Sequence, residues 1–209
     1  TTRRGPHAPG SPAAPGFRLP PWLRLLLLLT LSLLGRAATA RADTPLEAPG
    51  VAPFYAASQA DPDDRAARLR LCDALRRVGR IEARREAALQ YRLALKRWPK
   101  DADLLTAFGQ LRVEQGFLSQ GASLFKRALK SDPQRVEAEF GLARLALRDY
   151  LRFIEPRPLA ESRRRLDHVL QLDPAHRDAL YFRTLVLFEA GKPDSALDAW
   201  AQLGFDWIY

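Results

Sequence analysis

The sequence is poor in the residues that build metal and redox chemistry. Its 209 residues include one cysteine, three histidines and no methionine. A single cysteine excludes an internal disulfide and a zinc site built from several cysteines, and three well-separated histidines leave little for another metal centre. Because methionine is absent, Thr1 is either a processed start or the cut end of a longer chain. The composition predicts no metal, no cofactor and no catalytic residues, and it favours an interaction protein over an enzyme.

Acidic residues are absent from residues 1–42, which carry six arginines and therefore supply +6 of the formal net charge of +9. From Asp43 onward, 27 basic residues face 24 acidic ones. A nucleic-acid interface needs basic side chains gathered on one face so that they neutralise phosphates. The mixed-sign body therefore predicts no nucleic-acid partner.

Long hydrophobic runs are also lacking. The longest run in the N-terminal segment, Leu25–Leu34, has ten residues, whereas a membrane-spanning helix needs about twenty. Ten residues suit the apolar core of a secretory signal, and two A-x-A triplets follow it, ending at Ala40 and Ala42. We predict that residues 1–42 are a signal peptide and that the mature protein is periplasmic or secreted. The alternative is a protein anchored in the membrane by residues 22–34.

Residues 43–62 contain four prolines and are predicted to be a linker without a helix. Phe54 and Tyr55 within it could pack on the first helix beyond. The domain proper is then expected over residues 63–209.

The body has an internal repeat marked by prolines and glycines. Prolines recur at spacings of 37, 34 and 41 residues: Pro62, Pro99, Pro133 and Pro174. A glycine lies 17 residues after three of them: Gly79, Gly116 and Gly191. Leu, Ala and Phe recur at helical spacing between these turn signals. We therefore predict four helix–turn–helix units, at about 63–101, 102–135, 136–176 and 177–209.

Small and large residues alternate at fixed places in these units. Small residues lie ten positions after each opening proline: Cys72, Gly109, Ala143 and Thr184. Large ones occupy a matching place on the second helices: Tyr91, Phe125, Leu166 and Trp200. Two helices approach closely where small residues face each other, and a large neighbour fills the gap. Cys72 is accordingly predicted to be an inert, buried thiol.

This pattern resembles the tetratricopeptide repeat family over about residues 63–207. The unit at 102–135 carries most of the family's signature residues: Leu105, Phe108, Gly109, Gly121, Phe125, Ala128 and Pro133. The family's usual Trp and Tyr on the first helix are replaced by Leu105 and Arg112. The resemblance implies an all-α, right-handed superhelical solenoid of about four helix-turn-helix repeats, which binds other proteins and has no catalysis of its own.

Two units exceed the family's length. The first has three extra residues near Arg80–Arg84, expected to form a longer turn or helix start. The third has seven, and its first helix is expected to run from Gln134 to about Glu155, where Pro156 and Pro158 stop it. Its apolar end, with Tyr150, Phe153 and Ile154, either projects as a contact site or folds back onto the solenoid.

The resemblance also implies which residues line the concave face, because places two, five, nine and twelve of each first helix point into it. In the C-terminal half these places become apolar and aromatic. The predicted partner-binding residues are Phe140, Arg144, Leu147, Tyr181, Leu185 and Phe188. The alternative is that these rings are core, or are covered by residues 205–209 or by a further helix beyond them.

The sequence therefore predicts an exported protein–protein interaction scaffold that binds a protein or peptide partner through its concave face. A membrane contact is expected only through the N-terminal segment, if that segment is not cleaved. The alternative function is a helical accessory domain of a longer exported enzyme, or of a secretion or envelope-assembly component.

Overall fold

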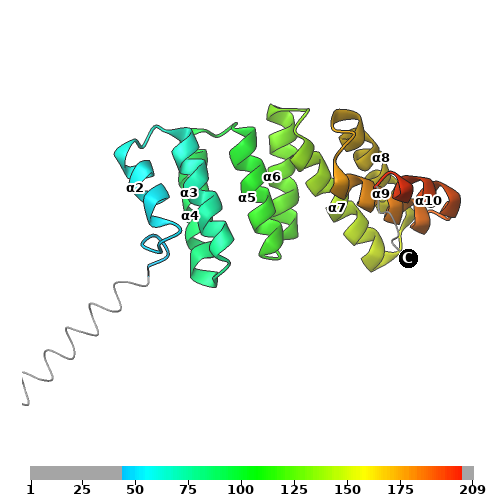
Figure 1. The fold of residues 1–209 in the computed structure, drawn as a ribbon, viewed down its shortest axis with the longest axis horizontal. Coiled ribbons are helices and arrows are strands. Elements are labelled where there is room, and N and C mark those ends of the chain that lie inside the picture. Colours follow the sequence, from blue (N-terminus) through cyan, green and yellow to red (C-terminus); the bar gives the residue numbers. More distant parts are fainter. Residues whose placement is uncertain (1–43, 204–209) are drawn as a thin grey trace, which may run out of the picture. The chain divides into compact units, whose positions relative to one another are not determined.

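The computed structural model describes residues 44–203, which contain helices and no strand (Figure 1). The helices are α2 (Ala52–Ala60), α3 (Arg65–Val78), α4 (Ile81–Arg97), α5 (Ala102–Glu114), α6 (Leu118–Ser131), α7 (Val136–Phe153), α8 (Pro156–Leu172), α9 (Arg177–Glu189) and α10 (Pro193–Ala201). The all-α prediction is confirmed. Within the described range, none of the helices combines the length and the apolar character that crossing a membrane requires.

The helices from α3 onward form four pairs, joined in three of them by a glycine turn. Gly79, Gly116 and Gly191 have φ values of 75°, 85° and 68°, in the left-handed region that side chains rarely adopt. Each glycine lies at the end of the first helix of its pair, so the chain reverses and the second helix packs on the first. The glycine spacing in the sequence thus marks real turns.

The pairs stack into a solenoid. Each first helix contacts the next first helix, in the order α3, α5, α7, α9, whereas no two second helices contact each other within residues 44–203. We infer from these contacts that the first helices lie on the inner side of the stack and the second helices on the outer side. We call the exposed surface of α3, α5, α7 and α9 the inner face.

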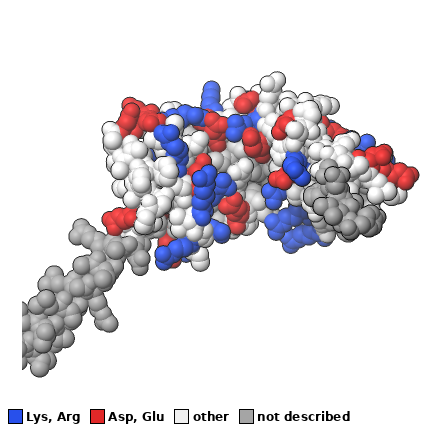
Figure 2. Space-filling model, viewed as in Figure 1, with Lys and Arg blue, Asp and Glu red and all other residues white. Residues whose placement is uncertain are grey.

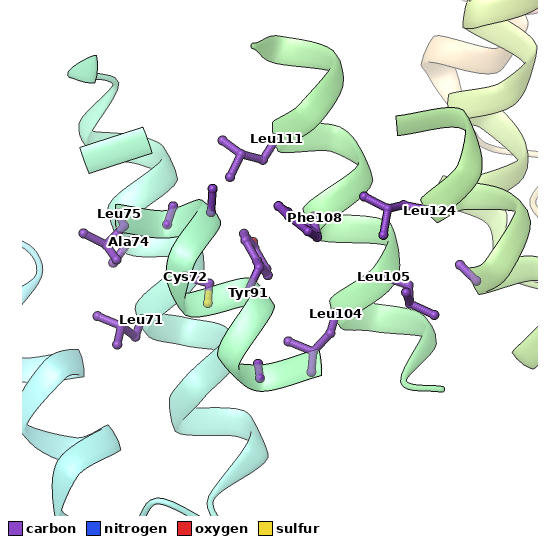
Figure 3. Close-up of a cluster of buried hydrophobic side chains, with 14 of the residues drawn as sticks. Leu71, Cys72, Ala74, Leu75, Tyr91, Leu104, Leu105, Phe108, Leu111 and Leu124 are labelled. Carbon is purple, nitrogen blue, oxygen red and sulfur yellow. The ribbon is translucent and has the colours of Figure 1, made fainter. Parts of the chain in front are cut away.

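A large side chain of the second helix α4 fills the seam between the first and second pairs (Figure 3). Tyr91 on α4 is fully buried and stacks on Phe108 of α5, with ring centroids 5.4 Å apart. Its hydroxyl donates a hydrogen bond of 3.0 Å to Asp73 on α3, so the buried polar group is satisfied. Cys72 lies in the same cluster and is fully buried, as predicted.

The ring of Phe125 on α6 fills the next seam, between α5 and α7, where two glycines leave room for it. A methyl group on Gly109 of α5 would lie 2.6 Å from Cε1 of the ring, and one on Gly141 of α7 would lie 2.6 Å from Cε2. Only glycine permits the ring to enter between the two first helices. Phe125 thereby contacts both its own repeat and the following one, which fixes their spacing.

A chain of ion pairs ties the starts of α3, α5 and α7 together. The Arg65 guanidinium donates to both Asp101 and Asp103, and Arg135 reaches Asp103 at 2.7 Å and Glu137 at 3.0 Å. Asp101 also caps α5 by accepting from the Leu104 N–H at 2.9 Å. Burial alone would raise the pKa of Asp101, but the Arg65 and Leu104 hydrogen bonds outweigh it and lower that pKa.

The prediction of a helix-free linker over residues 43–62 was wrong, because α2 occupies Ala52–Ala60. Pro53 lies in the first turn, where its missing N–H costs no intrahelical hydrogen bond. Val51 is fully buried and Tyr55 packs against the first core cluster, so tertiary contacts with the α3 region stabilise this short helix. Of the two residues expected to pack on the first helix beyond, Tyr55 packs against the core cluster, whereas Phe54 is exposed.

The connection between α7 and α8 also differs from the prediction. α7 ends at Phe153 because Ile154 adopts φ 57°, and Pro156 does not stop α7 but begins α8. Tyr150 packs into the second core cluster, whereas Phe153 and Ile154 are exposed. In the first unit the extra residues belong to the start of α4, which follows Gly79 after one residue.

We expect Gly109→Ala to lower the free energy of unfolding by about 1–3 kcal/mol, because Phe125 cannot move away from the new methyl without approaching Gly141. Urea denaturation followed by circular dichroism measures the change. The control is Gln120→Ala on the exposed side of α6, which should alter stability by about 0.5 kcal/mol or less. Equal midpoints for the two variants would show that the ring does not fill this seam.

Candidate partner-binding face

The last first helix, α9, carries large apolar side chains on its inner side. Tyr181, Leu185 and Phe188 are spaced four and three residues apart, so they lie on one face of the helix. Their exposed fractions are 41%, 36% and 66%. We call these three residues the α9 patch.

The patch exists because α9 is apolar on nearly all sides. Its opposite side provides the buried residues Ala179, Leu180, Thr184, Val186 and Leu187. A helix of this kind is normally enclosed by other elements. The helices described here cover one side of α9 and leave the patch in contact with solvent.

Aromatic contacts hold the patch in place. The ring of Tyr181 meets Phe182 edge-on at a centroid distance of 5.5 Å and lies 6.3 Å from Trp200 on α10. Phe182 in turn meets Phe140 of α7 at 5.5 Å. Sequence reasoning missed Phe182, because it does not occupy a place that faces the groove. Its position beside Tyr181 in the sequence does not indicate that its ring contacts both Tyr181 and Phe140.

Arg144 lies beside these rings. Its guanidinium is 5.7 Å from the Phe140 ring centroid and 5.5 Å from that of Phe182. The side chain is exposed, and among residues 44–203 it has no carboxylate partner. The rings of Phe140 and Phe182 thus hold the Arg144 guanidinium next to the α9 patch, where it can pair with a carboxylate of a partner.

The six predicted binding residues divide into two groups. Phe140 and Leu147 are 8% and 4% exposed and belong to the second core cluster with Leu166 and Val169. They support the inner face from within and are not available for direct contact. Arg144 and the α9 patch reach the surface, so we narrow the candidate contact residues to these four.

Neighbouring helices fix the orientation of α9. Arg183 donates to Asp167 of α8 at 2.8 Å, and the Tyr150 hydroxyl of α7 donates to Glu189 at 3.2 Å. Both contacts lie outside the α9 patch. The patch is therefore presented on a helix that is restrained from two sides.

The N-terminal half of the inner face has a different character, because its charges are paired. Arg76 on α3 donates to Glu114 on α5 at 2.9 Å, and the Arg65–Asp101–Asp103 contacts lie farther along. Acidic and basic side chains are interspersed over this part of the molecule (Figure 2). The apolar surface of the inner face is thus concentrated in its C-terminal half.

Among residues 44–203, the cysteine and the two histidines do not come together in a second site. Burial, helped by the Asp73 charge, raises the pKa of the Cys72 thiol to about 12, so the thiolate needed for nucleophilic attack is scarce at neutral pH. His176 caps α9 by accepting from the Ala179 N–H at 3.1 Å. Within residues 44–203, no group of three or more His, Cys, Asp or Glu residues could hold a metal ion.

Comparison with known proteins agrees with this geometry. A family model described as "Tetratricopeptide repeat" matches residues 106–149 and 159–204, which span α5 to α10. Over these residues the chain carries tetratricopeptide repeats. No curated protein sequence matches the chain significantly.

Solved structures share the fold at low sequence identity. Human IFIT1, solved as a dimer with m7Gppp-AAAA, superposes with a TM-score of 0.64 and 17% identity over 74% of this chain. MamA gives 0.58 and 13% over 73% of this chain and 84% of its own. A thermophilic TPR protein of Thermus thermophilus gives 0.57 and 20%, covering 66% of this chain and 72% of its own. The chain spans only 35% of the length of IFIT1. These likenesses establish an all-α solenoid.

Because Phe140 is buried and Phe188 is exposed, we expect their replacement by alanine to affect the free energy of unfolding to different extents. Phe140→Ala should lower the free energy of unfolding by about 3–5 kcal/mol, because it empties a filled core position. Phe188→Ala should change it by about 0.5 kcal/mol or less, because the ring is two-thirds exposed. Chemical denaturation of the two purified variants measures both. A large loss for Phe188→Ala would mean that another part of the protein covers the patch.

Proposed function

We propose that the chain is an exported scaffold that binds a protein or peptide partner through the inner face of α7 and α9. The observation that carries this proposal is the α9 patch: three large apolar side chains exposed together on the inner face of a tetratricopeptide-repeat solenoid. Interaction is what this repeat architecture supports in general. The α9 patch is where we propose that the partner binds.

The composition of the patch suits a binding site. Aromatic side chains, together with Arg, are enriched among the residues that dominate binding energy at protein interfaces. Tyr181 and Phe188 provide such rings, and Arg144 provides a guanidinium already oriented by Phe140 and Phe182. A partner segment that places apolar side chains on α9 and an acceptor oxygen near Arg144 would satisfy all of these groups.

A protein partner is favoured over nucleic acid, although the IFIT1 structures contain capped RNA. Binding to a phosphate backbone requires a continuous basic surface. The N-terminal half of the inner face instead pairs its arginines with Asp101, Asp103 and Glu114, and the C-terminal half is apolar.

Export is supported by the sequence alone, since residues 1–42 lie outside the described residues. The ten-residue apolar run and the two A-x-A triplets favour a cleaved signal peptide and a periplasmic or secreted protein. Anchoring by residues 22–34 is the alternative. A role as accessory domain of a longer exported enzyme, or of a secretion or envelope-assembly component, also stays a prediction.

The binding proposal is tested with peptides selected from a random display library on the immobilised protein. We expect the double variant Tyr181→Ala/Phe188→Ala to bind a selected, fluorescently labelled peptide about thirtyfold more weakly than the wild type, because two anchor rings are lost. Fluorescence anisotropy gives the affinity, and circular dichroism confirms that helicity is retained.

The matched control is Leu89→Ala/Leu93→Ala, which removes two exposed apolar side chains from the second helix α4. It should bind the peptide as the wild type does. A folded Tyr181→Ala/Phe188→Ala variant with undiminished affinity for every selected peptide would exclude the α9 patch as the binding site.

The export proposal has a separate test. Protein purified from its native host should begin at Asp43, or at Arg41 if cleavage follows the first A-x-A triplet. N-terminal sequencing decides between these positions. Recovery of residues 22–34 on the membrane-associated protein would support the anchored form instead.

A further inference from the structure

A second surface feature lies on α4 and the α5–α6 turn, well apart from α9. It begins with Arg112 on α5, at the place where the tetratricopeptide repeat family usually has a tyrosine. A neutral ring suits a seam between helices, whereas a guanidinium placed there must be partly desolvated. Burial, followed by the nearby Arg92 charge, lowers the pKa of Arg112. Burial and the Arg92 charge therefore both work against the charged form of Arg112.

Arg112 is held in a defined orientation. Its guanidinium lies over the rings of Phe108 and Phe117, at 4.8 Å and 5.3 Å from their centroids. One of its terminal nitrogens donates to the Gln115 side chain at 2.9 Å, and Gln115 donates to the backbone carbonyl of Arg84 at 3.2 Å. Such pre-organisation is what a guanidinium needs in order to pair with a carboxylate at little entropic cost.

The guanidinium lines a groove of about 500 Å³ between α4 and the end of α5. Four arginines border it together with one acid and one exposed ring: Arg84, Arg85, Arg92, Arg112, Glu114 and Phe117. We call it the arginine groove. An adjoining hollow of about 450 Å³ shares Arg92 and Arg112 with it and adds Ser119, Ser123 and Arg127.

The positive charges of this groove are not compensated within the described residues. None of the four arginines has a carboxylate within ion-pair distance there, and Glu114 already accepts from Arg76 at 2.9 Å. The Nε atoms of Arg84 and Arg112 are buried and lack any hydrogen-bond acceptor among residues 44–203. These two nitrogens are closed to solvent and therefore also to a ligand, so the anionic ligand is indicated instead by four arginines without a carboxylate partner in one groove.

We propose that the arginine groove binds an acidic peptide segment of a partner protein, with neighbouring Asp or Glu carboxylates paired to these arginines and an apolar side chain packed on Phe117. The exposed Ile81 at the rim and the half-exposed Phe117 ring favour a peptide, because both offer apolar contact beside the charges. A nucleic acid could stack a base on Phe117 but would leave the aliphatic side chain of Ile81 without an apolar partner. The proposal concerns a different surface from the α9 patch, so it does not depend on the proposed function.

The test uses the full chain and a labelled peptide of alternating Glu and Leu residues. We expect this peptide to bind, and Arg92→Gln/Arg112→Gln to weaken its affinity about tenfold or more, because truncating charged partners raises the dissociation rate. Affinity should also fall as salt is added. Fluorescence anisotropy measures each value. The double variant should unfold at a denaturant concentration equal to or above that of the wild type, since it removes uncompensated charge.

Matched controls distinguish the effect of losing a groove arginine on peptide affinity from the effect of losing any surface arginine. Arg148→Gln on α7, an exposed arginine without a carboxylate partner in the described range, should bind the acidic peptide as the wild type does. So should Tyr181→Ala/Phe188→Ala, which keeps the two proposals distinguishable. If Arg92→Gln/Arg112→Gln fails to fold, Arg85→Gln/Arg92→Gln changes two exposed side chains of the same groove and should weaken binding likewise.

Three results would overturn the proposal. The first is equal affinity of wild type and the folded groove variants for the acidic peptide. The second is equal affinity of the wild type for a control peptide in which Gln replaces every Glu. The third is tighter binding of single-stranded oligouridine than of the acidic peptide, which would assign the groove to nucleic acid.

Discussion

The whole arrangement depends on large side chains of the second helices entering gaps between consecutive first helices. Phe125 enters between Gly109 and Gly141, and Tyr91 stacks on Phe108 of the following pair. Each ring therefore contacts two repeats at once, and a substitution that excludes it would disturb both. In a stacked architecture, such nearest-neighbour contacts carry most of the stability that a single helix pair lacks.

The positions outside this seam are not constrained by the packing between repeats. The repeats therefore differ in the side chains that they expose on the inner face. The early first helices place charges on the inner face, where Arg65 and Arg135 both pair with Asp103 and so link one repeat to the next. The last first helix places Tyr181 and Phe188 there instead. A uniform scaffold thus presents a paired, polar region and an open, apolar region.

Both candidate surfaces carry a structural cost. Exposed aromatic rings on α9 gain nothing from burial, and the uncompensated arginines around Arg112 repel one another. Natural proteins retain such features chiefly where activity needs them, because stability and function compete at binding sites. The two surfaces differ in chemistry, so a partner could engage them with different segments.

The sequence alone determined the repeat, because the constraints involved are local. Proline and glycine limit backbone dihedrals wherever they occur, so the spacing from Pro99 to Gly116 predicted a helix and a turn without knowledge of neighbours. Exposure was decided only by the tertiary structure. Phe140 and Tyr181 occupy the same place in their repeats, yet the helices around α7 bury the first and those around α9 leave the second exposed. The sequence did not predict the helix α2 or the arginine groove, and the physical reason is the same for both. The burial of Val51 and the proximity of Arg84 to Arg112 depend on contacts between segments that are distant in the sequence.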